Sequence, residues 1–521
     1  MAPDLAGRVL TRAAEEPGRT AVELPGSPGS TLTYGALAAA ARTLAGRLHA
    51  RGARPGDTVA LVAASVPELV VALVAAAGAG LVCAPLDDAQ PPARVRRAME
   101  LAGARTALVA SPRRAAFWAA ELGAAALEVD VTATGDATPA GFPRPPAADD
   151  PAYLLFTSGS TGVPKGVRIS HGPFARHCEV AAGAYRLTPD SVTLQFASPG
   201  FDVALEEIWP TLLAGGRVVL RDGGLWSLPE LLDVTDAHGI TMWQLPTAYW
   251  TLLGAEAAAR EDLRPPATLD LVLIGGEAAT TAAARRWLDS PMGTVRLLNA
   301  YGPTEGVVTS TLYEVPRATG ALPAGETLPI GRALDGRSAL VLDDALRPVP
   351  AGVPGELHVT GPCLADGYAG DGTATARAFP TLPDGRRAFR TGDLVTRGAD
   401  GVLVYHGRRD RQVKISGVRV EPGEVEAALA ACTGVAAAAV TVAGAGDRAR
   451  LVAHVVPAEP PAEPSAAAGA LRAELAGRLP AAMVPARVEF HTRLPRTVND
   501  KVDHRALAAA PAARTDREET R

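Results

Sequence analysis

Hydrophobic positions in the first third of the chain alternate between helical spacing and short continuous runs. Leu37, Ala41, Leu44 and Leu48 recur at the spacing of an amphipathic helix. The apolar run 58–63 that follows is typical of a buried strand. This rhythm predicts parallel sheets covered by helices, and it resumes after a Pro/Gly/Ala/Asp-rich connection at 133–150.

The pattern changes after about residue 325. Short β-type runs alternate with Gly, Pro and Asp turns as far as 408, which predicts a mostly β subdomain. A compact α+β region follows, with a strand near 412–415 and a helix near 424–431. We therefore expect an α/β fold: a large N-terminal domain of two helix-covered mixed or parallel sheets plus a β subdomain (1–409), a small mobile α+β domain (410–508) and a disordered tail (509–521).

One segment is apolar enough to raise the question of a membrane span. Residues 69–86, LVVALVAAAGAGLVCAPL, are about long enough to cross a bilayer. The segment is rich in Ala and Gly, and Gly78 and Gly80 are typical of a helix end. We expect a buried helix followed by a strand at 81–84. The first 19 residues also lack the apolar core of a secretory signal, so the sequence predicts a cytoplasmic protein without membrane attachment.

Charge and cysteine content narrow the function classes. The 521 residues include 51 basic and 56 acidic side chains, a net charge of −5, and only 4% aromatic residues, which argues against a nucleic-acid-binding surface. The four cysteines, Cys83, Cys178, Cys363 and Cys432, are far apart and form no CxxC pair. This spacing predicts reduced, mostly buried thiols in a cytosolic protein.

Lysine is almost absent from this chain. Only Lys165, Lys414 and Lys501 occur, beside 48 arginines, although lysine is normally a common residue. An ammonium group is a compact charge that the planar guanidinium cannot replace. Each lysine falls in a run rich in Gly, Thr, Ser or Asp. We interpret the three as functional positions; chance survival on the surface is the alternative.

The first lysine closes a polar loop that follows an apolar strand at 153–156. The loop reads Thr157-Ser158-Gly159-Ser160-Thr161-Gly162-Val163-Pro164-Lys165-Gly166. Backbone N–H groups and hydroxyls of such a loop bind phosphate oxygens, and the lysine adds a mobile positive charge. The loop is not a Walker A loop, because proline and glycine flank the lysine. A polar surface turn is the alternative.

The run TSGSTGVPKG resembles the phosphate-loop signature of the adenylate-forming (ANL) superfamily, which includes acyl-CoA synthetases, luciferases and the amino-acid adenylation domains of nonribosomal peptide synthetases. Four further motifs follow in the family's order: NAYGPTE at 299–305, FRTGDL at 389–394, GRRDRQVK at 407–414 and LPRTVNDKVD at 494–503. The resemblance covers about residues 5–508. It implies activation of a carboxylate with ATP and Mg²⁺.

The resemblance also implies roles for individual residues. Asn299 and Tyr301 would hold and stack the adenine, Asp393 would accept from both ribose hydroxyls, and Arg408 would assist there. Asp410 would be the hinge between the domains. The full set of expected ATP- and AMP-binding residues is Thr157, Ser158, Gly159, Ser160, Thr161, Gly162, Lys165, Gly276, Glu277, Asn299, Ala300, Tyr301, Gly302, Asp393 and Arg408.

The expected catalytic residues are those nearest the phosphates. Thr304 would contact phosphate, and Glu305 would carry Mg²⁺, a hard cation that favours carboxylate and phosphate oxygens. Lys501 would bridge the substrate carboxylate and the α-phosphate, while Lys165 would steady the β- and γ-phosphates. Lys414 would face the site only after the small domain rotates.

Three residues depart from the family's usual pattern. Asp500 and His504 stand where glycine and arginine are more usual, and Ser416 stands where arginine often follows Lys-Ile. We expect these differences to alter rates or contacts with the thiol partner.

The stretch 201–206, FDVALE, resembles the start of the substrate pocket in amino-acid-activating members. Asp202 would pair with the substrate α-ammonium; a helix N-cap is the alternative. The pocket positions carried over are Asp202, Val203, Glu206, Gln244, Leu273, Gly275, Ala300, Val308 and Thr309.

The expected chemistry of the substrate side chain depends on Glu206. A carboxylate in an apolar pocket needs a partner, and Gly275 leaves room for a long side chain. We therefore expect a basic amino acid of the ornithine, lysine or arginine type, modified and β-amino versions included. Alternatively, Glu206 points outward on its helix, as Glu207 is expected to do.

The leading hypothesis is an amino-acid adenylating ligase that loads a phosphopantetheine carrier protein in trans. No HHxxxDG or GG[HDN]S motif occurs, so we expect a freestanding enzyme or a part of a larger synthetase. A small MbtH-like partner is possible, and nucleic acid and membrane are not expected partners. The alternatives are an acyl-CoA or aryl-acid ligase and an inactive nucleotide-binding scaffold.

Overall fold

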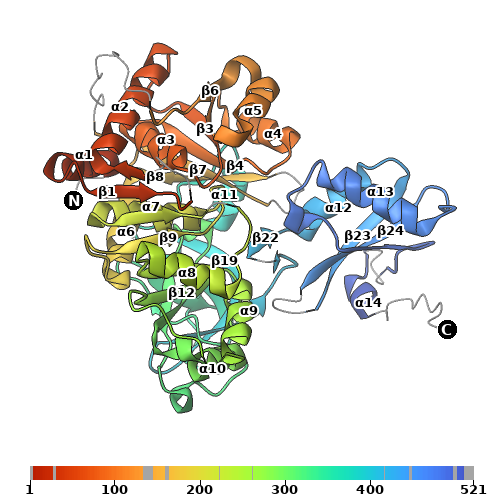
Figure 1. Cartoon of the computed structure of the whole chain (residues 1–521). Helices are drawn as coiled ribbons and strands as arrows, with labels where there is room; N and C mark the ends of the chain where they lie inside the picture. The colour runs from red at the N-terminus through yellow and green to blue at the C-terminus, as the bar shows by residue number, and fades with distance from the viewer. Residues whose placement is uncertain are drawn as a thin grey trace. The chain divides into compact units, whose positions relative to one another are not determined.

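The computed structural model describes residues 4–26, 31–132, 145–158, 164–221, 223–260, 262–415, 417–444, 449–496 and 502–509. The described chain divides into two compact units. The first consists of the residues up to 157 and from 164 to 410, and the second consists mainly of the residues from 411 onward. Figure 1 colours the first unit from red to cyan and the second in blue.

The first sheet of the larger unit is seven-stranded and covered by helices on both faces. Along β3 (Thr58–Ala63), Val59 and Leu61 pack in one core with α2 (Tyr34–Ala50) and α3 (Pro67–Gly78). Ala60 and Val62 pack in another core with α4 (Pro92–Ala102) and α5 (Ala115–Leu122). Burial on both faces explains why β3 is a continuous apolar run. In sheet order the strands are β18 (Gly367–Tyr368), β8 (Lys165–Ser170), β7 (Pro151–Thr157), β4 (Val82–Asp87), β3 (Thr58–Ala63), β5 (Thr106–Ala110) and β6 (Ala126–Glu128).

The second sheet of this unit has nine strands, parallel in its centre and antiparallel toward both edges. In sheet order they are β15 (Arg332–Ala333), β14 (Thr311–Glu314), β13 (Arg296–Tyr301), β12 (Leu271–Gly275), β11 (Met242–Pro246), β9 (Val192–Gln195), β10 (Arg217–Leu220), β1 (Thr20–Glu23) and β2 (Thr31–Thr33).

The helices of the larger unit follow the α/β rhythm expected from the sequence. Their bounds are α1 (Leu5–Glu15), α2 (Tyr34–Ala50), α3 (Pro67–Gly78), α4 (Pro92–Ala102), α5 (Ala115–Leu122), α6 (His171–Tyr185), α7 (Asp202–Ala214), α8 (Leu228–His238), α9 (Thr247–Ala258), α10 (Thr281–Asp289) and α11 (Gly372–Ala378).

Helices α6 and α7 lie between the two sheets (Figure 1). Phe174, early in α6, packs in the core of the first sheet, whereas Tyr185, at its end, packs against Leu271 and Leu273 of the second. Helix α7 is buried along most of its length and ends at Gly215, whose φ of +86° suits glycine. A helix enclosed on both sides can bring its polar residues to an interior site.

The remaining strands form a β subdomain and the smaller unit. The subdomain is an antiparallel sheet of β16 (Ser338–Leu342), β17 (Gly355–Thr360), β19 (Ala388–Arg397) and β20 (Leu403–Arg408). The smaller unit contains β21 (Val413–Ile415), β22 (Val418–Val420), α12 (Pro422–Ala430), β23 (Val435–Ala443), β24 (Arg450–Pro457), α13 (Pro464–Ala476), β25 (Arg487–Phe490) and α14 (His504–Ala509).

The structure confirms two expectations from the sequence, one about the apolar segment 69–86 of the larger unit and one about the cysteines, of which Cys432 lies in the smaller unit. The apolar segment 69–86 is a buried helix, α3, followed by a strand, β4, which extends three residues beyond the predicted end. Of the helices that the structure describes, none combines the length and the hydropathy of a transmembrane span. The four cysteines are free thiols and all are buried.

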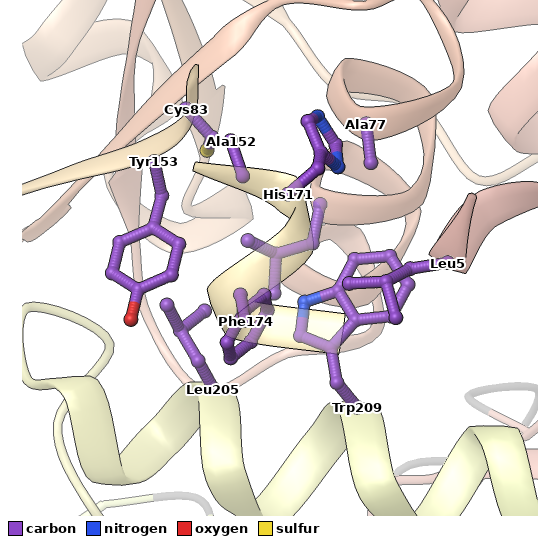
Figure 2. A pocket seen from close by; sticks show the side chains of 10 residues that line it. Leu5, Ala77, Cys83, Ala152, Tyr153, His171, Phe174, Leu205 and Trp209 are labelled. Carbon is purple, nitrogen blue, oxygen red and sulfur yellow. The ribbon is translucent and has the colours of Figure 1, made fainter. Parts of the chain in front are cut away.

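A cavity of about 20 Å³ lies where α1, α3, α6 and α7 meet β4 and β7 (Figure 2). Its lining is apolar apart from Tyr153 and His171. His171 is 1% exposed, and neither of its ring nitrogens has a hydrogen-bond partner among the described residues. Burial lowers the pKa of His171 to about 4, so the ring is neutral at pH 7.

This burial predicts a pH-dependent stability of the larger unit. The unfolded chain protonates His171 below about pH 6.5, but the folded chain does so only near pH 4, so acidification favours unfolding. Between pH 7 and pH 4 the free energy of unfolding should fall by about 3 kcal/mol through this residue, and His171→Leu should remove that part.

The measurement is chemical unfolding followed by tryptophan fluorescence, because all six tryptophans lie in the larger unit. His49→Leu, which changes an exposed histidine of α2, should retain the wild-type pH dependence. A His171→Leu protein with the wild-type pH dependence would contradict the prediction.

Candidate active site

The strands that flank the phosphate-type loop pair antiparallel, with Thr157 opposite Lys165. The roles expected for Gly159, Ser160, Thr161 and Gly162 fall outside the described residues and stay predictions. The ammonium nitrogen of Lys165 lies 5.1 Å from the centre of the Tyr368 ring. The cation at the end of this loop therefore stands over an aromatic face, which stabilises its charge.

Glu305 contacts the hydroxyl of the same tyrosine. Its side chain is fully buried in the short 3₁₀ turn Thr304–Gly306, and Oε1 accepts a hydrogen bond of 2.8 Å from the Tyr368 hydroxyl. The backbone carbonyl of Glu305 accepts from the N–H of Ala365 at 2.9 Å, which holds the turn in place. Hard carboxylate oxygens are the donors that Mg²⁺ prefers, so the donor chemistry fits the expected cation.

Backbone strain marks the loop between β13 and β14. Val307 and Val308 have φ values of +59° and +62°, a left-handed region that β-branched residues rarely adopt. A Cβ on Gly302 would stand 1.7 Å from the carbonyl oxygen of Val308, so only glycine fits there. Such strain persists where the surroundings over-determine the backbone, and it clusters at functional sites.

One carboxylate, Asp393 on β19, contacts Arg408, which is also expected at the ribose, and Tyr301, which is expected at the adenine. The Tyr301 hydroxyl donates to Oδ2, and Arg408 donates to Oδ1 at 2.8 Å from the paired strand β20. Arg408 also donates to both oxygens of Asp410, at 2.7 and 2.9 Å. Burial, with Asp393 beside it, raises the pKa of Tyr301 well above its usual range. The phenol therefore stays a donor, and the carboxylate retains acceptor capacity for hydroxyl groups.

Two residues that are expected to contact the nucleotide, Asn299 and Glu277, form hydrogen bonds within the protein. Asn299 is 2% exposed, and its side-chain amide donates to the carbonyl of Pro329 at 2.8 Å. The hydroxyl of Thr247 donates to the carbonyls of Gly275 and Glu277 at 3.0 and 3.2 Å. The roles expected for Asn299, Gly276 and Glu277 at ATP stay predictions.

Gly275 is required by strand packing as well as by any substrate. It pairs with Ala300 across β12 and β13, and a Cβ on Gly275 would stand 2.9 Å from the Ala300 carbonyl oxygen. The close approach of the two strands therefore excludes a side chain here. The expectation that Gly275 leaves room for a long substrate stays a prediction.

Glu206 points into the protein rather than outward. It is 1% exposed, and Oε2 accepts hydrogen bonds from Gln244 at 2.6 Å and from Thr309 at 3.1 Å. Nε2 of His177 lies 2.8 Å from Oε1. Three pocket positions carried over from the family are thus in direct contact, together with a histidine of α6.

A buried arginine stands behind this histidine. Nη2 of Arg337 lies 2.9 Å from Nδ1 of His177 and 3.1 Å from the carbonyl oxygen of Val307. Burial lowers the pKa of His177, so a neutral ring links the guanidinium to Glu206. Burial alone would raise the pKa of Glu206, but His177 and its two hydrogen-bond donors outweigh that effect and lower it. The carboxylate is therefore charged, and its counter-charge is Arg337.

The expectation that Glu207 points outward is wrong. Glu207 is fully buried and accepts the backbone N–H groups of Phe196 and Ala197 at 3.1 Å each. Burial raises the pKa of Glu207 to about 8. Because α7 is enclosed between two sheets, neither glutamate can reach solvent.

Four further pocket positions lie on α7 and in the second sheet. Asp202 and Val203 begin α7 and are half-buried. Leu273 and Ala300 lie in the core cluster of the second sheet that also contains Tyr185, whose hydroxyl lies 3.5 Å from that of Thr309.

Sequence reasoning missed His177, Arg337 and Tyr368. Each acts on a site residue through a contact between segments far apart in the chain, and none stands in a recognised motif. The only available signal was a single histidine, arginine or tyrosine within an otherwise apolar or turn-like stretch.

The lysines of the smaller unit are described in part. Lys414 lies on β21 opposite Arg419 and is half-buried. Lys501, like Asp500 and Ser416, falls outside the described residues, and its expected role stays a prediction.

The position of Asp393 at the expected ribose site leads to a quantitative prediction. Asp393→Asn should raise the KM for ATP by about 10- to 100-fold, because the amide loses acceptor capacity and charge for hydroxyl partners. Pyrophosphate exchange measured against ATP concentration tests this. Asp400→Asn, at an exposed turn, is the matched control, and an unchanged KM in Asp393→Asn would contradict the assignment.

Two known protein families match this chain. The AMP-binding enzyme family matches residues 9–369, and the AMP-binding enzyme C-terminal domain matches residues 424–501. The chain is 41% identical over 514 residues to an isonitrile lipopeptide synthase of Streptomyces coeruleorubidus, covering 96% of this chain but 33% of that protein. It is 37% identical to novobiocin biosynthesis protein H of Streptomyces niveus, covering 94% of this chain and 81% of that protein.

A solved structure has the same architecture. NpsA-ThdA, an artificially fused adenylation–PCP di-domain from Klebsiella oxytoca, superposes with a TM-score of 0.82 at 26% identity and 94% coverage of both chains. This match confirms the fold class expected from the sequence.

Proposed function

The chain belongs to the AMP-binding enzyme family, and we propose that it activates an amino acid as aminoacyl-AMP and passes it to the phosphopantetheine thiol of a carrier protein. The observation that carries the proposal is a pair of carboxylates on α7: Asp202 in its first turn and Glu206 one turn later. Residues four apart share a helix face. One carboxylate can meet the substrate α-ammonium while the other meets the side chain.

The first half-reaction requires positive charge on the phosphates. An oxygen of the substrate carboxylate attacks the α-phosphorus of ATP, the bond to the bridging oxygen breaks, and pyrophosphate leaves. Lys165 and Lys501 would stabilise the charge that develops. Mg²⁺ held by Glu305 would supply further charge neutralisation when bound.

The second half-reaction transfers the acyl group. The carrier thiol loses its proton to solvent, its sulfur attacks the carbonyl carbon, the bond from that carbon to the phosphate oxygen breaks, and AMP leaves. We assign Lys414 to this step and Asp410 to the hinge that would precede it. The carrier protein would act in trans, and an MbtH-like protein is a further candidate partner.

For the substrate side chain, we propose a long group that ends in N–H donors, with ornithine, lysine and arginine types first. The polar end of the pocket offers acceptors. Gln244 turns its amide nitrogen toward Glu206, and its Oε1 has no hydrogen-bond partner among the described residues although the residue is only 7% exposed. A buried acceptor without a donor is costly, and a substrate ammonium would satisfy it.

A neutral amide or ureido side chain is the second candidate. The observation that favours it is the internal counter-charge: Arg337, through His177, already balances Glu206. A cationic substrate would leave one uncompensated positive charge in the pocket, whereas a neutral N–H donor would not.

Amino-acid-dependent pyrophosphate exchange separates these candidates. The panel should compare ornithine, lysine and arginine with glutamine and citrulline, in wild type and in Glu206→Ala. Glu100→Ala, at an exposed position of α4, is the control. A basic preference that survives Glu206→Ala would show that Glu206 does not select the substrate.

A further assay tests the class of reaction. If only aryl or fatty acids support exchange, and CoA accepts the acyl group, the amino-acid proposal is overturned in favour of an acid–CoA ligase. ATP binding without pyrophosphate exchange for any acid would support the other alternative, an inactive nucleotide-binding scaffold.

A further inference from the structure

Three metal-ligating side chains meet on the smaller unit, outside the site described above. His454 lies on β24, Glu489 on β25, and His491 directly follows β25. The two strands run parallel with His454 opposite Glu489. Residues two apart on a strand share a face, so Glu489 and His491 point the same way. Among the described residues, this is the one group of three such side chains whose ligand atoms lie within 4.8 Å of one another.

The spacing of the three ligand atoms matches a tetrahedral site. Nδ1 of His454 lies 3.0 Å from Nε2 of His491 and 3.3 Å from Oε2 of Glu489, and the last two atoms are 3.9 Å apart. Nitrogen and oxygen ligands stand about 2.0–2.2 Å from Zn²⁺, so ligand atoms of a tetrahedral site are about 3.3–3.6 Å apart. The observed separations bracket this range.

Neighbouring groups orient the ligands. Nε2 of His454 lies 2.8 Å from the hydroxyl of Thr441, which leaves Nδ1 for the cluster. Arg487 contacts Oε1 of Glu489 at 2.6 Å, which leaves Oε2 for the cluster. Support of this kind is typical of protein metal sites, where a partner fixes the ring and the carboxylate.

Burial gives the cluster one closed and one open side. The side chain of His454 is 3% exposed, whereas those of Glu489 and His491 are 22% and 26% exposed. We propose that His454, Glu489 and His491 bind one zinc-type divalent cation, with water in the fourth position. Two imidazoles and one carboxylate suit Zn²⁺ rather than Mg²⁺, which favours oxygen ligands. The proposal does not depend on the amino acid that the enzyme activates.

The proposed metal site lies at the start of the chain segment that leads toward Lys501. The chain runs from His491 through Leu494, which is buried against Ala439 and Leu507, to Arg496, which pairs with Val502. The expected catalytic Lys501 lies between these two paired residues. A cation at His491 would fix the start of the segment that leads to this lysine.

Cobalt binding tests the proposal directly. The full chain, with any affinity tag removed and stripped of metal by a chelator, is titrated with Co²⁺, and the visible d–d absorption is recorded. We expect one equivalent to bind with a tetrahedral spectrum, Zn²⁺ to displace it, and Mg²⁺ to have no effect. Buried cysteines cannot compete for the ion.

Single substitutions locate the site. His491→Ala and Glu489→Gln, both at half-exposed positions, should each weaken binding by at least about 10-fold. His49→Ala, at an exposed histidine of α2, should bind as wild type does. Circular dichroism confirms that the variants fold. The absence of a Co²⁺ spectrum in the wild-type protein, or wild-type affinity in His491→Ala, would overturn the proposal.

Discussion

Replacing Lys501 with arginine is expected to lower amino-acid-dependent pyrophosphate exchange by about 10²- to 10³-fold, the cost of losing one preorganised charge at a developing oxyanion. One ammonium can contact both the substrate carboxylate and the α-phosphate, whereas a guanidinium holds a planar, bidentate geometry. The described residues on either side of position 501 are held in place: Arg496 pairs with Val502, and the N–H of Asp503 donates to the carbonyl of Pro495 at 2.8 Å. Because these neighbours are held, we do not expect them to shift to accommodate a longer, forked side chain at position 501.

Lys414→Arg is the matched variant for this prediction. It should leave pyrophosphate exchange within about 3-fold of wild type and slow transfer to a carrier thiol, because we assign Lys414 to the second half-reaction. Exchange and single-turnover loading of a phosphopantetheinylated carrier measure the two steps separately. Equal losses of exchange in both variants would contradict this division between the lysines.

Arg337→Met is expected to destabilise the larger unit by about 3–5 kcal/mol, the usual cost of leaving one partner of a buried ion pair uncompensated. Arg337 is 8% exposed, and its charge reaches Glu206 through a neutral His177. Methionine retains much of the side-chain volume without the charge. Chemical unfolding followed by tryptophan fluorescence measures the loss.

The double variant Arg337→Met/Glu206→Gln tests whether charge is the cause. Removing both charges should restore most of the lost stability, because the remaining amide can still contact Gln244 and Thr309. Additive losses in the double variant would show that Arg337 stabilises the fold by packing or by its contact with the Val307 carbonyl instead.

The single variant Arg337→Met also tests the substrate preference. In Arg337→Met, Glu206 has lost its internal counter-charge, and a cationic side chain becomes its best partner. The ratio of exchange with ornithine to exchange with glutamine should therefore rise in this variant. A fall in that ratio would contradict the proposed role of Glu206.

The order of elements could be read from the sequence because it depends on local patterns. The run predicted as a strand at 58–63 coincides with β3, and the apolar residues at helical spacing between 37 and 48 lie within α2. The apolar segment 69–86 could be separated from a membrane span by its glycines. The nucleotide motifs are likewise contiguous runs, in which a strand and a polar loop place their own functional groups.

The surroundings of Glu206 and Glu207 could not be read in this way. Both stand on α7, and nothing local indicates that two sheets would enclose that helix. The sequence by itself determined the family, the α/β architecture and the three lysines as chemically distinct positions. Only the tertiary structure decided that Glu206 is charged and balanced by Arg337 through His177, and that His454, Glu489 and His491 converge. Burial and charge pairing join residues far apart in the chain, and a linear pattern carries no information about such distances.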